Sequence, residues 1–140
     1  MLDSRVGAEL SWESRMEGSM PRVFDLEERT LRFAKSVRSF ISHLPHTISN
    51  TEVSRQLLRS ACSVGANYIE ANEALGKKDF LYHIRISRKE AKESHYWLEI
   101  IECDPSNEGN RNSLSDEALQ LMKIFGAIVR KFETTPMKPD

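Results

Sequence analysis

Residues 59–71 read RSACSVGANYIEA, at the centre of the segment that decides the fold, residues 49–101. At about 100° per residue, the larger apolar side chains of this region fall on one half of a helix. The other half is small and polar, and it carries Ser60, Ser63, Ala66, Asn67, Glu70 and Ala74. Small side chains allow another element to come close, so we expect this half to be packed as well. The pattern predicts a long helix over residues 50–75.

A second long helix, residues 79–102, is predicted after a tight turn at Gly76, Lys77 and Lys78. Ser49 or Asn50 is expected to cap the start of the first helix, and Gly76 to close its end. The second helix has two nearly contiguous apolar faces. One comprises Phe80, Ile84, Ala91, Leu98 and Ile101; the other comprises Tyr82, Ile86, Tyr96, Trp97 and Ile100.

Two flanking helices have a single apolar stripe each. The first is expected to start at Asp25, in a capping box with Glu28, and to stop at Pro45. The last is expected to start near Ser113 or Ser115. Its predicted stripe comprises Ala118, Leu121, Met122, Phe125, Ile128, Val129 and Phe132.

Four helices with short connections predict an all-α fold, an antiparallel up-down-up-down four-helix bundle. The bundle should span residues 24–133, between a flexible N-terminal extension (1–23) and a frayed C-terminal tail (134–140). A lone bundle covers each helix on one side, whereas the two central helices need cover on two. We therefore expect a homo-oligomer, with another copy of the chain as the simplest cover.

The bulk composition gives no general attraction to nucleic acid or to an anionic membrane. The formal net charge of the 140 residues is -1 and the pI is near 6.4. No apolar run approaches the roughly 18 residues of a membrane helix, and the N-terminus lacks the pattern of a signal peptide. In the predicted hairpin Cys62 and Cys103 lie roughly 16 Å apart along the helix axis, too far for a disulfide. A cytoplasmic protein with reduced cysteines is expected.

The pattern from Leu57 through Val64, Asn67 and Glu70, and then from Phe80 to Leu98, resembles a known family. It is similar to the four-helix-bundle family of bacterial proteins named after 23S rRNA intervening sequences, over roughly residues 24–132. The resemblance implies a ring-like homopentamer of antiparallel bundles with no known catalytic activity. A related branch, the accessory proteins of diversity-generating retroelements, binds RNA and a reverse transcriptase, but that branch is markedly basic and this chain is not.

Polar residues within the second apolar face predict a seam between the two central helices. A buried carboxylate needs a partner or a proton, and the register lets Arg59 meet Glu93 and Asn67 reach Glu90 or Ser87. We interpret the seam as structural, fixing register or oligomer geometry; the alternative is a pocket for a small polar ligand. The predicted seam comprises Arg59, Asn67, Glu70, Glu90, Glu93 and Trp97.

Basic residues form a stripe on the same helix, at positions spaced by three or four residues. Such a stripe is most often a solvated face, but it is also suited to contacting phosphates. The candidate nucleic-acid-binding residues are Lys77, Lys78, Arg85, Arg88, Lys89 and Lys92.

Catalytic patterns are absent from the sequence. The acidic pairs Glu70/Glu73 and Glu90/Glu93 are not followed by the histidines of a di-iron bundle, no nucleophile has a matched base at a readable spacing, and no glycine-rich phosphate loop occurs. We expect no enzyme, no metal and no cofactor. The sequence favours a non-catalytic oligomeric scaffold whose partner is itself. The alternative is an adaptor that binds structured RNA or a nucleoprotein.

Overall fold

The computed structural model describes residues 26–134, which form four long helices. Their bounds are α2 (Leu26–Ile41), α3 (Ile48–Asn72), α4 (Lys77–Ile100) and α5 (Glu108–Glu133), with a short 3-10 turn, η3 (Pro105–Asn107), before α5. No strand occurs in this part of the chain. The predicted all-α fold with four helices is confirmed.

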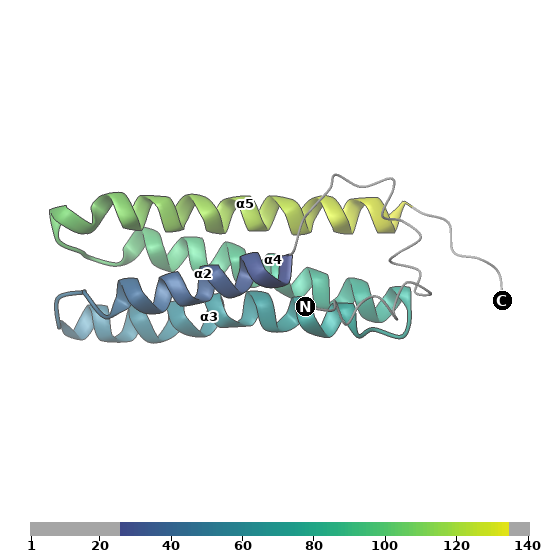
Figure 1. Cartoon of the computed structure of the whole chain (residues 1–140), viewed down its shortest axis with the longest axis horizontal. Helices are drawn as coiled ribbons and strands as arrows, with labels where there is room; N and C mark the ends of the chain where they lie inside the picture. Colours follow the sequence, from purple (N-terminus) through teal and green to yellow (C-terminus); the bar gives the residue numbers. More distant parts are fainter. Residues whose placement is uncertain (1–25, 135–140) are drawn as a thin grey trace.

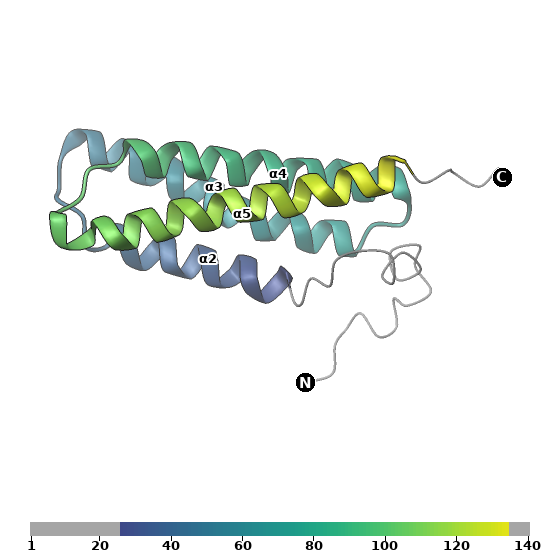
Figure 2. The same cartoon turned by 90° about the horizontal axis from the view of Figure 1, so that it is seen from above.

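The four helices lie side by side, with α2 shorter than the others (Figures 1 and 2). The α2–α3 and α4–α5 connections lie at one end, and the α3–α4 connection lies at the other (Figure 1). Helix α3 packs between α2 and α4, and α5 closes the arrangement by packing on α4 and α2. Each helix therefore buries one side against the centre of the bundle.

Apolar side chains from all four helices meet in one core. The rings of Phe80 in α4 and Phe132 in α5 lie 5.1 Å apart, and those of Tyr68 in α3 and Phe125 in α5 lie 5.8 Å apart. The predicted inner face of α4 and most of the predicted stripe of α5 are buried. The fully buried large side chains include Phe40, Leu57, Val64, Ile84, Leu98 and Leu121.

Small residues bring α3 and α4 close together. Ser60 and Ser94 are fully buried, and the Ser94 hydroxyl donates to the Ser60 hydroxyl at 2.9 Å. The Ser87 hydroxyl donates to the carbonyl of Val64 at 2.9 Å. Each buried hydroxyl thus has a partner, as burial requires. Of the small polar half of α3, only part is packed in this way, because Ala66 and Glu70 are exposed.

Several predicted helix ends are wrong. The N-cap of α3 is Thr47, whose hydroxyl accepts the Asn50 N–H at 3.0 Å, so neither Ser49 nor Asn50 is the cap. Helix α3 ends at Asn72, and Gly76 precedes α4 instead of closing α3. Helix α5 begins at Glu108, ahead of the predicted serines, because η3 turns the chain directly into it.

The remaining expectations fall partly outside the described residues. The predicted cap at Asp25 and the predicted extension 1–23 lie there, as does the tail beyond residue 134. Cys62 is exposed, Cys103 is half-buried, and both are free thiols. No helix within residues 26–134 is long and apolar enough to cross a membrane.

Candidate functional site

The exposed half of α4 has two flanks with different chemistry. On the flank next to α3, Glu90 and Glu93 contact Arg59. On the flank next to α5, Arg85 pairs with Glu133 and His95 contacts Ser115. Within the described residues, the sides of α4 that face α3 and α5 are occupied, so a partner would meet the exposed outer half of α4, its outward arc.

A charged cluster occupies the flank next to α3. The Arg59 guanidinium donates to Glu93 Oε1 at 2.5 Å from Nη2 and lies 3.4 Å from Glu90 Oε2 through Nη1. The Trp97 indole N–H donates to the same Glu93 oxygen at 3.1 Å. These four residues of the predicted seam lie together, so one arginine bridges two carboxylates of the neighbouring helix.

Burial differs within this cluster, and the pKa values of its two carboxylates shift in opposite directions. The side chains of Arg59, Glu93 and Glu90 are 48%, 28% and 13% exposed. Burial raises the pKa of Glu90, and the attraction of Arg59 offsets this only in part. Burial also acts to raise the pKa of Glu93, but hydrogen bonds from Trp97 and Arg59 outweigh it and the pKa is lowered. The Arg59–Glu93 ion pair is only partly buried. Its contribution to stability should therefore be closer to that of an exposed ion pair than to that of a buried one.

Asn67 and Glu70 lie apart from this cluster. The Asn67 amide donates to the carbonyl of Ser63 at 3.0 Å, and its oxygen lies 3.2 Å from His83 Nδ1. The expected contacts of Asn67 with Glu90 or Ser87 are thus wrong, because Ser87 points to the α3 backbone instead. Glu70 is exposed and forms no ion pair with any described residue.

Large hydrophobic side chains are exposed along the same outward arc. Tyr82, Tyr96 and Ile100 are 59%, 58% and 41% exposed, and the Tyr96 ring lies edge-on to Trp97 at 5.1 Å. Successive members of the arc are three or four residues apart and so share a face. We call this set the α4 outer stripe; it comprises Tyr82, Ile86, Lys89, Glu93, Tyr96 and Ile100.

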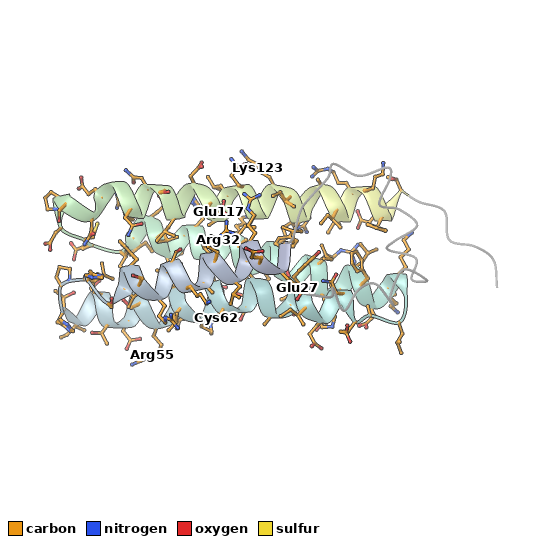
Figure 3. The ribbon with its side chains drawn as sticks, viewed as in Figure 1. Glu27, Arg32, Arg55, Cys62, Glu117 and Lys123 are labelled. Atoms are coloured by element: carbon orange, nitrogen blue, oxygen red, sulfur yellow. The ribbon has the colours of Figure 1, made fainter. Side chains whose placement is uncertain are left out.

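A second apolar patch lies on a different side of the chain. Leu31 of α2 and Ile69 of α3 are exposed large hydrophobics, and Cys62 of α3 is exposed one turn from residue 65. The close approach of Thr30 to Gly65 places this part of α2 beside this part of α3. Figure 3 shows Cys62 on the outer side of α3. We call Leu31, Cys62 and Ile69 the α2–α3 patch.

The predicted basic stripe is not uniform. Arg85 is neutralised by an ion pair with Glu133 of α5. Lys78, Lys89 and Lys92 are exposed, Arg88 is half-buried, and none of these four forms an ion pair within residues 26–134. Lys77 is half-buried in the first turn of α4. The stripe therefore has its free positive charge at Lys78 and between residues 88 and 92.

One polar cluster escaped the sequence reasoning. The nearly buried Ser115 hydroxyl lies 2.7 Å from both Glu99 Oε2 and His95 Nδ1. A hydroxyl has one proton, and donating it to Glu99 leaves the oxygen to accept from His95. Ser115 therefore lies between Glu99 and His95. In a catalytic triad the histidine lies between the serine and the carboxylate, so this order is not that of a triad. This arrangement joins α4 to α5, and no spacing signal connects its members across the loop.

Among the described residues, no group of three or more histidine, cysteine, aspartate or glutamate side chains is placed to hold a metal ion. The exposed side chains of α4 form an aromatic and apolar stripe with a charged centre, and a basic flank.

Comparisons with known proteins agree with this helical arrangement. A family model described as "23S rRNA-intervening sequence protein" matches residues 24–127. Among solved structures, a protein with unknown function from the S23 ribosomal protein family of Bacteroides thetaiotaomicron is similar. It is 27% identical with a TM-score of 0.63, over 74% of this chain and 97% of that chain. A comparison with curated proteins gives no match.

Proposed function

The chain belongs to the 23S rRNA-intervening sequence protein family, and from this premise we propose that it is a non-catalytic, homo-oligomeric four-helix-bundle scaffold. The exposed aromatic and apolar α4 outer stripe is the observation that carries the proposal. We further propose that antiparallel up-down-up-down bundles assemble into a ring. Five copies is the number that the family resemblance favours.

The α4 outer stripe has the composition of an interface centre. Interface hot spots are enriched in Trp, Tyr and Arg, and Tyr82, Tyr96, Trp97 and Arg59 lie on or beside the stripe. Its two ends are apolar, while its centre carries Lys89 and Glu93, which have opposite charges. The hydrogen bonds from Arg59 and Trp97 fix the orientation of the Glu93 side chain in advance. Glu93 would therefore lose little conformational entropy when a second copy binds.

The existence of two patches favours a ring over a two-fold dimer. A two-fold interface joins the same patch on both copies, whereas a closed ring joins two different patches. The α4 outer stripe and the α2–α3 patch lie on different helices, and each exposes large hydrophobic side chains. In the proposed ring the stripe of one copy packs against the patch of the next.

Light scattering tests the scaffold. The wild type should have a mass several times 16.1 kDa, and Tyr96→Glu with Ile100→Glu should reduce it to the monomer because two carboxylates cannot be buried without partners. The matched control is Ile48→Glu with Leu75→Glu, which alters two exposed hydrophobic residues outside both patches and should leave the mass unchanged. A monomeric wild type would refute the scaffold.

A mixing experiment tests the ring specifically. Leu31→Glu with Ile69→Glu spoils the α2–α3 patch, and the Tyr96, Ile100 variant spoils the stripe. Each double variant alone should be monomeric, but a mixture should form a dimer with one copy of each, joined by the one interface that stays intact. If the Leu31, Ile69 variant assembles as the wild type does, the patch plays no part and the interface joins stripe to stripe.

A second candidate function is an adaptor for structured RNA or a nucleoprotein. Arg88, Lys89 and Lys92 favour it, because they form no ion pair in the described part of the chain. In an oligomer the basic flank recurs once per copy, and several weak contacts add up to useful affinity. Replacing Arg88 and Lys92 by alanine, which leaves every residue of the α4 outer stripe in place, should weaken salt-sensitive binding of structured RNA without changing the mass seen by light scattering.

A further inference from the structure

Two arginines, one from α4 and one from α5, border Gly126 of α5. A Cβ atom placed on Gly126 would lie 3.5 Å from Arg130 Nη1 and 3.6 Å from Arg88 Cδ. The stem of Arg88 therefore lies across the α5 backbone where that helix lacks a side chain, and the guanidinium of Arg130 lies beside it. Neither arginine forms an ion pair with any residue between 26 and 134.

Two lysines extend this positive surface along the outer edge of the α4–α5 contact. Lys92 lies one turn from Arg88 on α4, and Lys123 lies two turns from Arg130 on α5, so each shares a face with its arginine. Both lysines are exposed, and Figure 3 shows Lys123 on the outer side of α5. We call Arg88, Lys92, Lys123 and Arg130 the basic groove.

The carboxylates bordering the basic groove already have partners. Glu133 pairs with Arg85. Glu99 accepts a hydrogen bond from the neutral Ser115 hydroxyl and keeps its own negative charge. Neither Arg88 nor Arg130 has a carboxylate partner among the described residues, so the positive charge beside Gly126 is available to an anion, which both guanidinium groups would attract.

We propose that the basic groove binds the phosphate backbone of RNA, with Arg88 and Arg130 holding one phosphate between them over Gly126. This inference rests on the adaptor function and names its site. A guanidinium presents a planar set of donors that matches phosphate oxygens. The basic groove combines Arg88 and Lys92 of the predicted basic stripe with Lys123 and Arg130 of α5. Arg85 is not part of it, because Glu133 neutralises Arg85.

RNA fits this surface better than an acidic protein does. Protein interfaces are built around apolar and aromatic centres, and the exposed large hydrophobics of the described residues lie elsewhere, on the stripe, the α2–α3 patch and the helix ends. The groove presents a track of separated positive charges about two helical turns long, roughly 10 Å. Such a track suits a polymer with a charge on every unit, and it carries no means of reading bases.

Gly126 provides a sharp test, because one substitution can fill the site without removing any cation. Gly126→Glu should place a carboxylate between Arg88 and Arg130 and occupy them internally. Gly126→Gln is its matched control, with the same shape and no charge. The measurement is binding of a short RNA hairpin by fluorescence anisotropy at about 50 and 200 mM salt, where backbone contacts are sensitive to salt. Thermal melting of both variants shows that they fold.

The Gly126→Glu variant should bind RNA about tenfold more weakly than the Gly126→Gln variant at the lower salt. Its slope of log affinity against log salt should be shallower by about 0.7 to 0.9, the effect of one lost phosphate contact. Equal binding by the two variants, or no binding by the wild type at low salt, would overturn the proposal. Polyglutamate of equal charge competing as well as RNA would also overturn it, and would indicate an acidic protein partner.

Failure of the scaffold and failure of the groove are distinguishable. Light scattering in the same buffers reports the mass of each variant. A monomeric wild type refutes the scaffold but leaves the comparison of Gly126→Glu with Gly126→Gln intact, since both arginines and the glycine belong to one chain.

Discussion

Gly65 and Gly126 both lie inside long helices, but their surroundings differ. A Cβ on Gly65 would lie 2.8 Å from Thr30 Oγ1 and 3.1 Å from Thr30 Cβ, whereas a Cβ on Gly126 would have only ordinary contacts. Thr30 cannot easily move, because it is buried and its hydroxyl donates to the carbonyl of Leu26 at 2.7 Å. At the residue scale, Gly65 is therefore what allows α2 to approach α3.

Gly65→Ala should destabilise the protein. Overpacking costs about 1–3 kcal/mol, and the better helix propensity of alanine returns at most about 1 kcal/mol. Gly126→Ala is the control, and it should stabilise by up to about 1 kcal/mol. Urea unfolding measures both. In a Thr30→Ala background most of the cost of Gly65→Ala should disappear, and a stabilising Gly65→Ala in the wild-type background would contradict the close approach.

Glu90 and Glu93 should respond oppositely to pH. The raised pKa of Glu90 means that the folded state binds this proton more tightly than the unfolded chain, so its contribution to the free energy of unfolding is present below pH 4.5 and is lost as pH rises through the folded pKa. The lowered pKa of Glu93 means that its contribution is present above pH 4.5 and is lost as pH falls.

Urea unfolding across this pH range, with Glu90→Gln and Glu93→Gln, checks these signs. The free energy of unfolding of the Glu90→Gln variant, relative to that of the wild type, should increase as pH rises above 4.5. The free energy of unfolding of the Glu93→Gln variant, relative to that of the wild type, should decrease as pH rises towards 4.5 from below. If the two variants have parallel pH profiles, then Arg59 and Trp97 do not shift the pKa values of Glu90 and Glu93 apart.

At the scale of elements, Asn50 holds three segments together. Its buried side chain donates to the carbonyls of Pro45 and Glu102, at 3.1 and 2.9 Å, and accepts the Glu102 N–H at 3.1 Å. Pro45 lies in the α2–α3 connection and Glu102 follows the end of α4. One side chain thus satisfies backbone groups that the helix ends leave unpaired.

Asn50→Ala should cost about 1–3 kcal/mol, because it leaves buried backbone donors and acceptors without partners. Asn110→Ala, at an exposed position of α5, is the control and should stay within about 0.5 kcal/mol of the wild type. Hydrogen exchange at the Glu102 amide should quicken in the Asn50 variant alone. Equal losses of stability in the two variants would exclude the proposed role of Asn50.

At the scale of the whole molecule, α4 serves two surfaces at once. Its outward arc carries the α4 outer stripe beside the Arg59 cluster, and its α5 flank carries part of the basic groove. The two surfaces share no residue, so in the proposed assembly a copy packed on the stripe would leave Arg88 and Arg130 open. Assembly would then repeat the groove around the ring and strengthen RNA binding through multivalency.

Assembly should also make the melting temperature depend on protein concentration, because only the folded state associates. Raising the concentration tenfold should raise the melting temperature of the wild type and leave that of the Tyr96→Glu, Ile100→Glu variant unchanged. Differential scanning calorimetry of both proteins measures this. A wild type whose melting temperature is independent of concentration would contradict an assembly held by the stripe.

The sequence by itself determined the helices, their order and the core-facing stripes, since these follow from the periodicity of apolar residues along one chain. It also indicated the approach of Arg59 to Glu93, because register in a hairpin follows from counting residues from the turn. Helix ends were less predictable, as caps such as Thr47 depend on which competing side chain reaches a backbone N–H.

Only the tertiary structure decided which polar residues meet across elements. Asn67 contacts His83 instead of Glu90, Arg85 is neutralised by Glu133, and Arg88 and Arg130 both border Gly126. These contacts depend on the rotation of α4 about its own axis and on its offset from α5, and both are set by how the whole core packs. Arg85 and Glu133 lie 48 positions apart in the sequence, so no local spacing encodes either quantity.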